Sequence, residues 1–367
     1  MYNFRKNLVG RLQASGCSVV AVGADLDGYE LRLRDGGVDF RTVPVPMSGF
    51  SPLGDLKLFW AFFRIFRRVR PQVAHMFTIK PVIYGTLAAA AAGVPRRICT
   101  VTGLGHAFTE SGGLVRFVRI IAEVLYRVAL SQAHVVFFQN EDDRELFISR
   151  RLVAADKARM VPGSGVDLDR FQPPPGPRPA RPVRFLMVTR LIRDKGVMEF
   201  VEAAERLAAA GLDVDFRLLG SEDARNPTRL TPEEIVRLRA SPVKWLGGVE
   251  DVRPALAEAD VVVLPSYYRE GTPRVLLEAM AMGKPIVTTD APGCRHLVEP
   301  GVNGYLTPVR NASALAEAMA RCAASLPDLE RMGQAARRFV ELNYSETVVL
   351  DRCMASYAPW VGETAPP

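Results

Sequence analysis

The chain has 367 residues, which is long enough for two domains that each bury a core. Hydrophobic residues make up 48% and charged residues 24%, a balance that excludes a disordered chain. The net charge of +7 favours phosphorylated substrates or an anionic membrane surface, and the absence of zinc-finger, RNA-binding-sheet or basic-zipper signatures argues against nucleic acid. Five scattered cysteines without a C-x-x-C pair indicate a reducing cytoplasm rather than a disulfide framework or zinc site.

The first residues predict a helix from about Phe4 to Ser15, ended by Gly16, and then a strand from Ser18 to Val22. A doubly wound domain normally begins with a strand and a glycine-rich turn before its first helix. We therefore expect that this central strand, within about a dozen residues, belongs upstream of the given sequence. The alternative is a domain that tolerates its loss.

Two segments of the first half combine aromatic and aliphatic side chains with arginines. They are DLKLFWAFFRIFRRVR (Asp55 to Arg70) and LVRFVRIIAEVLYRVAL (Leu114 to Leu130), and both predict helices. Each is either a buried crossover helix or an interfacial helix that lies on anionic lipid. Two such helices in one half fit an acceptor that enters from a membrane.

Loops that follow strands in the first half contain candidate ligand contacts. Lys80 follows a strand at Val73 to His75, where it suits an anionic acceptor, although an ordinary surface lysine is as good an interpretation. The next predicted strand ends at Thr102, and Gly103 after it allows the backbone to approach a ligand closely.

The proline-rich segment from Phe171 to Val183 predicts the linker to a second domain, which opens with a strand from Arg184 to Thr189. Arg190 and Lys195 follow this strand in the turn before a helix. Two cations at the carboxyl end of a strand are suited to holding a diphosphate, although such a pair taken alone is more often two solvated surface charges.

The segment from Val261 to Asp290 predicts a buried strand (Val261 to Leu264), a loop, a helix and a second strand. Thr272 is expected to cap the helix, with Pro273 in its first turn. Glu270 and Glu278 lie on either side of this helix start, whose free N–H groups can bind phosphate. An isolated pair of glutamates is more often solvated, but this arrangement suits a ligand with hydroxyls on both sides of a diphosphate, such as a nucleotide-sugar.

The segment PSYYREGTPRVLLEAMAMGKPIVTTDAPGCRHLVEPGVNGYL resembles the signature of the family 4 retaining glycosyltransferases of GT-B fold. The resemblance extends over nearly the whole chain and is greatest to the bacterial branch that builds lipid-linked oligosaccharides. Further matching motifs are FTIKPVIYG (77–85), TGLGHAFTE (102–110), PGSGVD (162–167), TRLIRDKG (189–196), LGSEDARNP (219–227) and WLGGVEDV (245–252).

The resemblance implies an α/β chain with two doubly wound, Rossmann-like domains facing a cleft. Residues 1–170 would bind the acceptor, 171–344 would bind the nucleotide-sugar donor, and 345–367 would form a helix that crosses back to the first domain. The implied activity moves a hexose or N-acetylhexosamine from a nucleotide-sugar, expected to be a UDP-sugar, to a polyprenyl-diphosphate-linked sugar. Neither a cofactor nor a metal is expected, and the enzyme is expected at the inner face of the cytoplasmic membrane.

The resemblance also assigns the site residues. Arg190, Lys195 and Glu270 would be catalytic. Donor contacts would come from Gly220, Gly271, Thr272, Pro273, Arg274 and Glu278. Acceptor or sugar contacts would come from Lys80, Thr102, Gly103 and His106. Many relatives have histidine where this chain has Thr102, so the role of that position is open. Two other classes remain at this point: a nucleotide-sugar epimerase and a catalytically inactive sugar-nucleotide binding protein.

Overall fold

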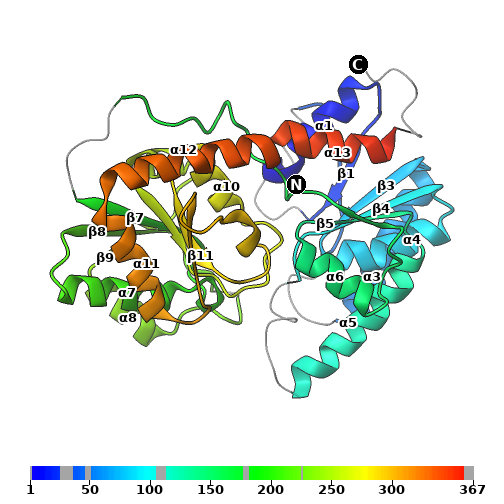
Figure 1. Ribbon diagram of the computed structural model, residues 1–367. Helices are drawn as coiled ribbons and strands as arrows, with labels where there is room; N and C mark the ends of the chain where they lie inside the picture. Colours follow the sequence, from blue (N-terminus) through cyan, green and yellow to red (C-terminus); the bar gives the residue numbers. More distant parts are fainter. Residues whose placement is uncertain are drawn as a thin grey trace. The chain divides into compact units, whose positions relative to one another are not determined.

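The computed structural model describes residues 2–24, 36–45, 51–104, 113–176, 182–224 and 226–358. The chain divides into two compact units (Figure 1). The first unit comprises Met1–Ser164 and Thr347–Pro367, and the second comprises Gly165–Glu346. Every strand pairing of both units is parallel among the described strands. The predicted α/β fold with two doubly wound domains is confirmed.

The described strands of the first unit form two separate sheets. One pairs β1 with β2, and the other has the order β3-β4-β5-β6. The strands are β1 (Val20–Gly23), β2 (Asp39–Thr42), β3 (Val73–Phe77), β4 (Arg96–Val101), β5 (Val135–Phe138) and β6 (Ala158–Met160).

Helix α1 (Tyr2–Ala14) packs on both sheets of this unit. Leu8 belongs to a cluster with Phe137 of β5, whereas Val9 belongs to a cluster with Ala21 and Phe40 of β1 and β2. Among the described strands, β1 is bonded only to β2, and β3 only to β4, so no described strand joins the two sheets.

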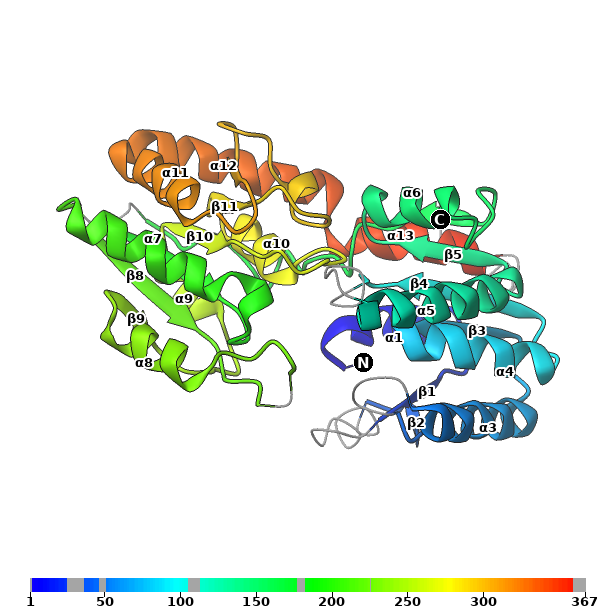
Figure 2. The ribbon, with the colours of Figure 1, turned by 90° about the horizontal axis from the view of Figure 1, so that it is seen from below.

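Helices pack on both faces of the β3–β6 sheet. Figure 2 shows two of them, α4 (Thr86–Ala91) and α5 (Gly113–Ser131), beside its strands. One face packs against the apolar sides of α3 (Pro52–Val69), the π-helix η1 (Pro81–Gly85), α4 (Thr86–Ala91), α5 (Gly113–Ser131) and α6 (Glu141–Ser149). The opposite face packs against α1 and the last helix, α13 (Glu346–Tyr357). The helices predicted over 55–70 and 114–130 are thus confirmed, and each also buries one apolar side.

The second unit has one sheet of order β12-β11-β10-β7-β8-β9. Its strands are β7 (Val183–Val188), β8 (Val214–Leu219), β9 (Val243–Trp245), β10 (Val261–Leu264), β11 (Ile286–Thr289) and β12 (Gly304–Thr307). Its helices are α7 (Val197–Ala209), α8 (Pro232–Ala240), α9 (Arg253–Glu258), α10 (Arg274–Ala281), α11 (Ala312–Ala324) and α12 (Leu326–Asn343), with short 3₁₀ turns at Arg193–Lys195 (η3) and Arg295–Leu297 (η4).

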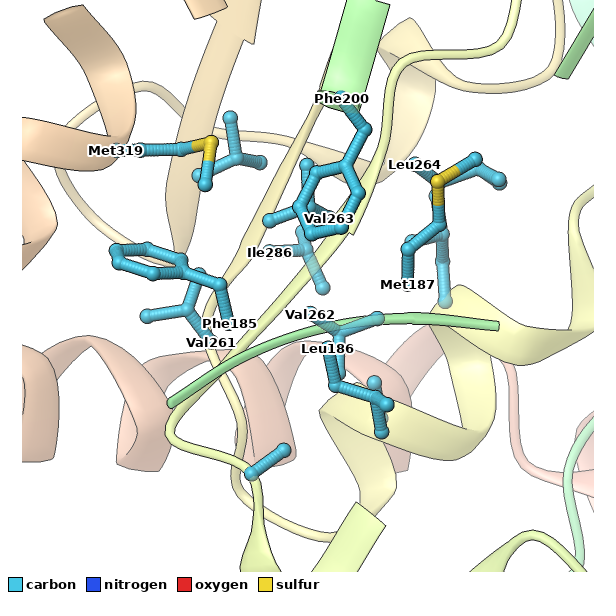
Figure 3. Packing of buried hydrophobic residues seen from close by; sticks show 14 of the residues in the cluster. Phe185, Leu186, Met187, Phe200, Val261, Val262, Val263, Leu264, Ile286 and Met319 are labelled. Carbon is cyan, nitrogen blue, oxygen red and sulfur yellow. The ribbon is translucent and has the colours of Figure 1, made fainter. Parts of the chain in front are cut away.

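Apolar side chains of β7, β10 and β11 pack together at the centre of this sheet, as Figure 3 shows. Val261, Val262 and Val263 of β10 are 0% exposed, because helices cover both faces of the parallel sheet. The predicted strand at 261–264 is confirmed. The prediction that Thr272 caps the following helix is wrong: α10 begins at Arg274, and Pro273 occupies the cap position with an extended ψ of 112°.

Candidate active site

The loops that follow β7 and β10 bring Lys195 and Glu270 together. The two strands are hydrogen-bonded neighbours, so the loops at their carboxyl ends meet at one edge of the sheet. Lys195 Nζ forms an ion pair with Glu270 Oε1, and the two side chains are only 14% and 12% exposed. The ammonium also lies 5.2 Å from the ring centroid of Tyr268. A cation and a carboxylate are thus fixed side by side where ligands of such sheets bind.

The loop that contains Glu270 is tied to the turn that contains Lys195. The backbone N–H groups of Tyr267 and Tyr268 both donate to the carbonyl oxygen of Asp194, each at 2.9 Å. The Ser266 hydroxyl donates to Glu270 Oε1 at 3.1 Å. These bonds fix the carboxylate relative to the cation before any substrate binds.

A close backbone contact supports the same loop from the side of β11. Gly293 has a φ of +82°, and a Cβ atom at this position would lie 2.5 Å from the Gly271 carbonyl oxygen and 2.6 Å from that of Glu270. Only glycine allows this approach without displacement of the loop. The polypeptide after β11 therefore helps to set the position of Glu270 and Gly271.

Arg190 lies two residues beyond β7 and is more accessible than Lys195. Its guanidinium donates to Asp223 Oδ2 at 2.7 Å, and its side chain is 54% exposed. Gly220, at the end of β8, accepts a hydrogen bond from Trp245 Nε1 at 2.8 Å and donates one to the Gly247 carbonyl at 2.7 Å. Arg190 thus stands beyond the carboxyl end of β7, the neighbour of β10, and Gly220 stands beyond the end of β8, one strand further along the sheet.

Glu278 lies within α10 and is 9% exposed. Burial raises the pKa of this carboxyl, and the Arg274 guanidinium, 2.9 Å away, opposes that rise. Gly271, Thr272, Pro273 and Arg274 lead into the helix, so all predicted donor contacts of the β10–α10 segment lie along one turn and its loop. The two carboxylates Glu270 and Glu278 are on either side of the helix start, as expected from their spacing.

The predicted acceptor contacts belong to the first unit. Lys80 follows β3 and donates to Asp55 Oδ1 of α3 at 2.9 Å. Thr102 and Gly103 directly follow β4, and Gly103 has a φ of +109°. His106 lies outside the described residues. The structure therefore adds a partner for Lys80 that the sequence did not indicate.

Several residues that build the site were missed from the sequence. Asp194, Ser266, Tyr268 and Asp223 all contact a predicted site residue or its loop. The serine four residues before Glu270 was a usable signal, since a hydroxyl in a tight loop can bond a nearby carboxylate. The other three contacts depend on which strands are neighbours, which the sequence does not give.

Among the described residues, no group of three or more histidine, cysteine, aspartate or glutamate side chains is arranged to hold a metal ion. Within the same part of the chain, every helix is too short or too polar for a bilayer span.

Comparison with known proteins defines the class. A model described as a glycosyl transferase 4-like domain matches residues 4–164, and one described as glycosyl transferases group 1 matches residues 182–325. The chain is a glycosyltransferase. Together the two matches cover most of the chain, so it belongs to the glycosyltransferases that combine these two domains. The resemblance found in the sequence is confirmed.

Two similar relatives span most of the chain. N,N'-diacetylbacillosaminyl-diphospho-undecaprenol alpha-1,3-N-acetylgalactosaminyltransferase of Campylobacter jejuni is 27% identical over 370 residues, which covers 97% of this chain and 95% of the relative. UDP-Gal:alpha-D-GlcNAc-diphosphoundecaprenol alpha-1,3-galactosyltransferase of Escherichia coli is 26% identical over 290 residues, covering 76% and 73%.

Solved structures share the fold. A glycosyltransferase from Rickettsia africae superposes with a TM-score of 0.78 at 16% identity, covering 100% of this chain and 97% of that one. Sucrose-phosphate synthase from Thermosynechococcus elongatus has a TM-score of 0.80 at 20% identity, covering 96% and 91%. These likenesses confirm the predicted GT-B architecture.

Proposed function

We propose that this glycosyltransferase moves a hexose or N-acetylhexosamine from a UDP-sugar to a polyprenyl-diphosphate-linked sugar, with retention of anomeric configuration and without a metal. One observation supports the proposal above all: Lys195 and Glu270 are fixed together at the carboxyl ends of β7 and β10, next to the start of α10. Both relatives described above act, by their names, on diphospho-undecaprenol-linked sugars.

The departing nucleoside diphosphate gains negative charge as the bond to the sugar breaks. Fixed cations and the N–H groups of a helix start can stabilise that charge in place of a metal. Lys195 is suited to this role because its ammonium is nearly buried yet has two N–H groups beyond the one that meets Glu270. Arg190 can leave Asp223 and offer two parallel donors to a phosphate.

In the proposed reaction, the bond between the anomeric carbon and the diphosphate oxygen breaks, and the acceptor hydroxyl oxygen bonds to that carbon on the same face. The hydroxyl proton goes to the departing phosphate oxygen, so a separate general base is not needed. Glu270 holds hydroxyls of the transferred sugar, and Glu278 holds those of the ribose. A carboxylate suits each role because it accepts bonds from two adjacent hydroxyls.

The test is transfer itself. UDP-, GDP- and ADP-sugars are incubated with the protein and a polyprenyl-diphosphate N-acetylhexosamine, and release of the nucleoside diphosphate is followed. We expect UDP release that depends on the acceptor and a lipid product one sugar longer. Release from a UDP-sugar without any acceptor would point to hydrolysis, and interconversion of the donor sugar would point to the epimerase class; either result would contradict the proposal.

We further propose that the first unit binds the surface of an anionic membrane through α5. Phe117, Ile120, Val124 and Val128 lie three or four residues apart on this helix and are between 50% and 60% exposed. This α5 stripe has the exposed Arg116 and Arg127 beside it. On α3, the exposed Leu53, Leu56 and Trp60 are likewise followed by exposed arginines. Exposed apolar residues with flanking cations favour the interface of an anionic bilayer.

This surface predicts a specific binding defect. We expect the protein to sediment with phosphatidylglycerol vesicles, and a Phe117→Ser/Val124→Ser variant to bind them about thirtyfold more weakly or worse, since a buried phenylalanine alone contributes ~2 kcal/mol. Val236→Ser is the matched control, because Val236 is 67% exposed on α8 of the second unit. Equal binding by the α5 variant and the control would contradict the assignment.

A further inference from the structure

Asp55 is a buried carboxylate on an otherwise apolar side of α3. It is 3% exposed, and Leu58 and Phe62 follow it on the same buried side. Two side chains donate to it: Lys80 Nζ at 2.9 Å to one oxygen and the Tyr84 hydroxyl at 3.1 Å to the other. Burial of a carboxylate is costly unless it is paired, and an apolar residue could fill such a site at no loss of stability. The arrangement therefore calls for a reason beyond packing.

Both side-chain partners of Asp55 come from the segment that directly follows β3. Lys80 is the last residue before η1, and Tyr84 lies within that π-helix. Burial and the neighbouring Asp55 raise the pKa of Tyr84 to about 12, which keeps its hydroxyl a donor. Gly85 lets the helix pack closely, since a Cβ there would lie 3.0 Å from the Met76 side chain of β3. The π-helix is thereby held by the hydrogen bond of Tyr84 to Asp55 and by the close packing of Gly85 on β3.

Thr78, between β3 and Lys80, has a φ of +68°. The positive-φ residues Arg70 and Arg151 come at the ends of helices α3 and α6, where such a conformation is common. Thr78 instead follows a strand, and its β-branched side chain makes a positive φ unfavourable. Strained residues of this kind persist where the surroundings fix them, and they are frequent at ligand sites.

The accessible side chains of the segment that follows β3 are suited to binding a phosphate group. The Thr78 side chain is exposed, and the Lys80 side chain is 16% exposed while held by Asp55. A hydroxyl and an ammonium fixed at the carboxyl end of a parallel strand match the oxygens of a phosphate. Because Asp55 orders the lysine in advance, binding costs less side-chain entropy than it would for a free lysine.

We propose that Thr78 and Lys80 bind the diphosphate of the prenyl-linked acceptor, and that Asp55 and Tyr84 are positioning residues that hold these two groups in place. The inference rests on the proposed function, because that function supplies the acceptor. The inference goes beyond the proposed function because it names a binding site for the acceptor diphosphate. That site can be tested by binding alone, whether or not transfer is observed.

The test measures binding of a short-chain prenyl diphosphate and of UDP by titration calorimetry, with the full chain. Tyr84→Phe removes one donor to Asp55 without a change of shape, and we expect it to weaken binding of the prenyl diphosphate about fivefold while UDP binding is unchanged. Tyr126→Phe is the matched control, because Tyr126 is a fully buried tyrosine of the same unit, on α5. It should leave both affinities unchanged.

A second variant separates function from stability. Thr78→Gly relieves the unfavourable φ, so its midpoint of thermal unfolding should equal or exceed that of the wild type. It also removes the hydroxyl, so its affinity for the prenyl diphosphate should fall while UDP binding is retained.

Loss of affinity for both ligands in Tyr84→Phe, or unchanged prenyl-diphosphate binding in both variants, would overturn the inference. Failure of sugar transfer by the wild type, with the selective binding losses intact, would overturn the proposed function and leave this site standing.

Discussion

Replacement of both Arg190 and Lys195 by alanine is expected to lower kcat by about three orders of magnitude or more, since each cation stabilises the departing diphosphate. The two side chains reach the same edge of the sheet from the turn after β7. Lys195 is also the ion-pair partner of Glu270, so thermal unfolding is measured alongside to separate lost catalysis from lost folding. The readout is steady-state release of UDP with acceptor present.

Arg193→Ala is the matched control for this double variant. Arg193 lies between the two residues in sequence, is 45% exposed, and pairs with Glu234 of α8 instead of facing β10. It should keep nearly wild-type turnover. Normal turnover by the double variant would refute the diphosphate assignment.

Glu278→Gln should raise the KM for the donor with little change in kcat, because the ribose contact is present in both ground and transition states.

Gly196→Ala is expected to destabilise the second unit severely. Gly196 joins Lys195 to α7 with a φ of +78°, and a Cβ there would lie 2.2 Å from the Pro265 carbonyl oxygen. The backbone carbonyl cannot move away without distorting the end of β10. We expect a loss of ~3 kcal/mol or more in the free energy of unfolding, made up of the unfavourable φ and the clash. Denaturant titration followed by circular dichroism measures it.

The opposite end of the same helix provides the control. Gly211 has a φ of +74°, yet a Cβ at this position would meet nothing within 4 Å. Gly211→Ala should therefore cost only the conformational term, about 1 kcal/mol. Equal losses for the two variants would show that the contact with Pro265 does not matter.

Local chemistry accounts for what the sequence could predict. The run of apolar, mostly β-branched residues at 261–264 is typical of a parallel strand that is buried on both faces, and β10 is such a strand. Asn140 caps α6 through local chemistry of the same kind, because its side chain accepts from the Asp143 N–H. The start of α8 was missed despite a clear signal, since Thr231 and Glu234 form a reciprocal capping box.

The contacts that the sequence could not predict depend on which strands and helices are neighbours in space. Lys195 and Glu270 are 75 residues apart, and they meet because β10 happens to be the neighbour of β7. The pairing of Lys80 with Asp55 likewise requires that α3 lie against the π-helix that follows β3. Neither a hydrophobic period nor a turn residue encodes such neighbours, so sequence reasoning identified the charged residues but not their partners.

The central claim is that the chain's own cations, rather than a metal, support transfer with retention. The most direct measurement is the reaction of a UDP-sugar with a polyprenyl-diphosphate N-acetylhexosamine in EDTA, with the anomeric configuration of the product read by NMR. We predict equal rates in EDTA and in Mg²⁺, and a new glycosidic bond with the same configuration as the donor. A reaction abolished by EDTA, or a product of inverted configuration, would contradict this account.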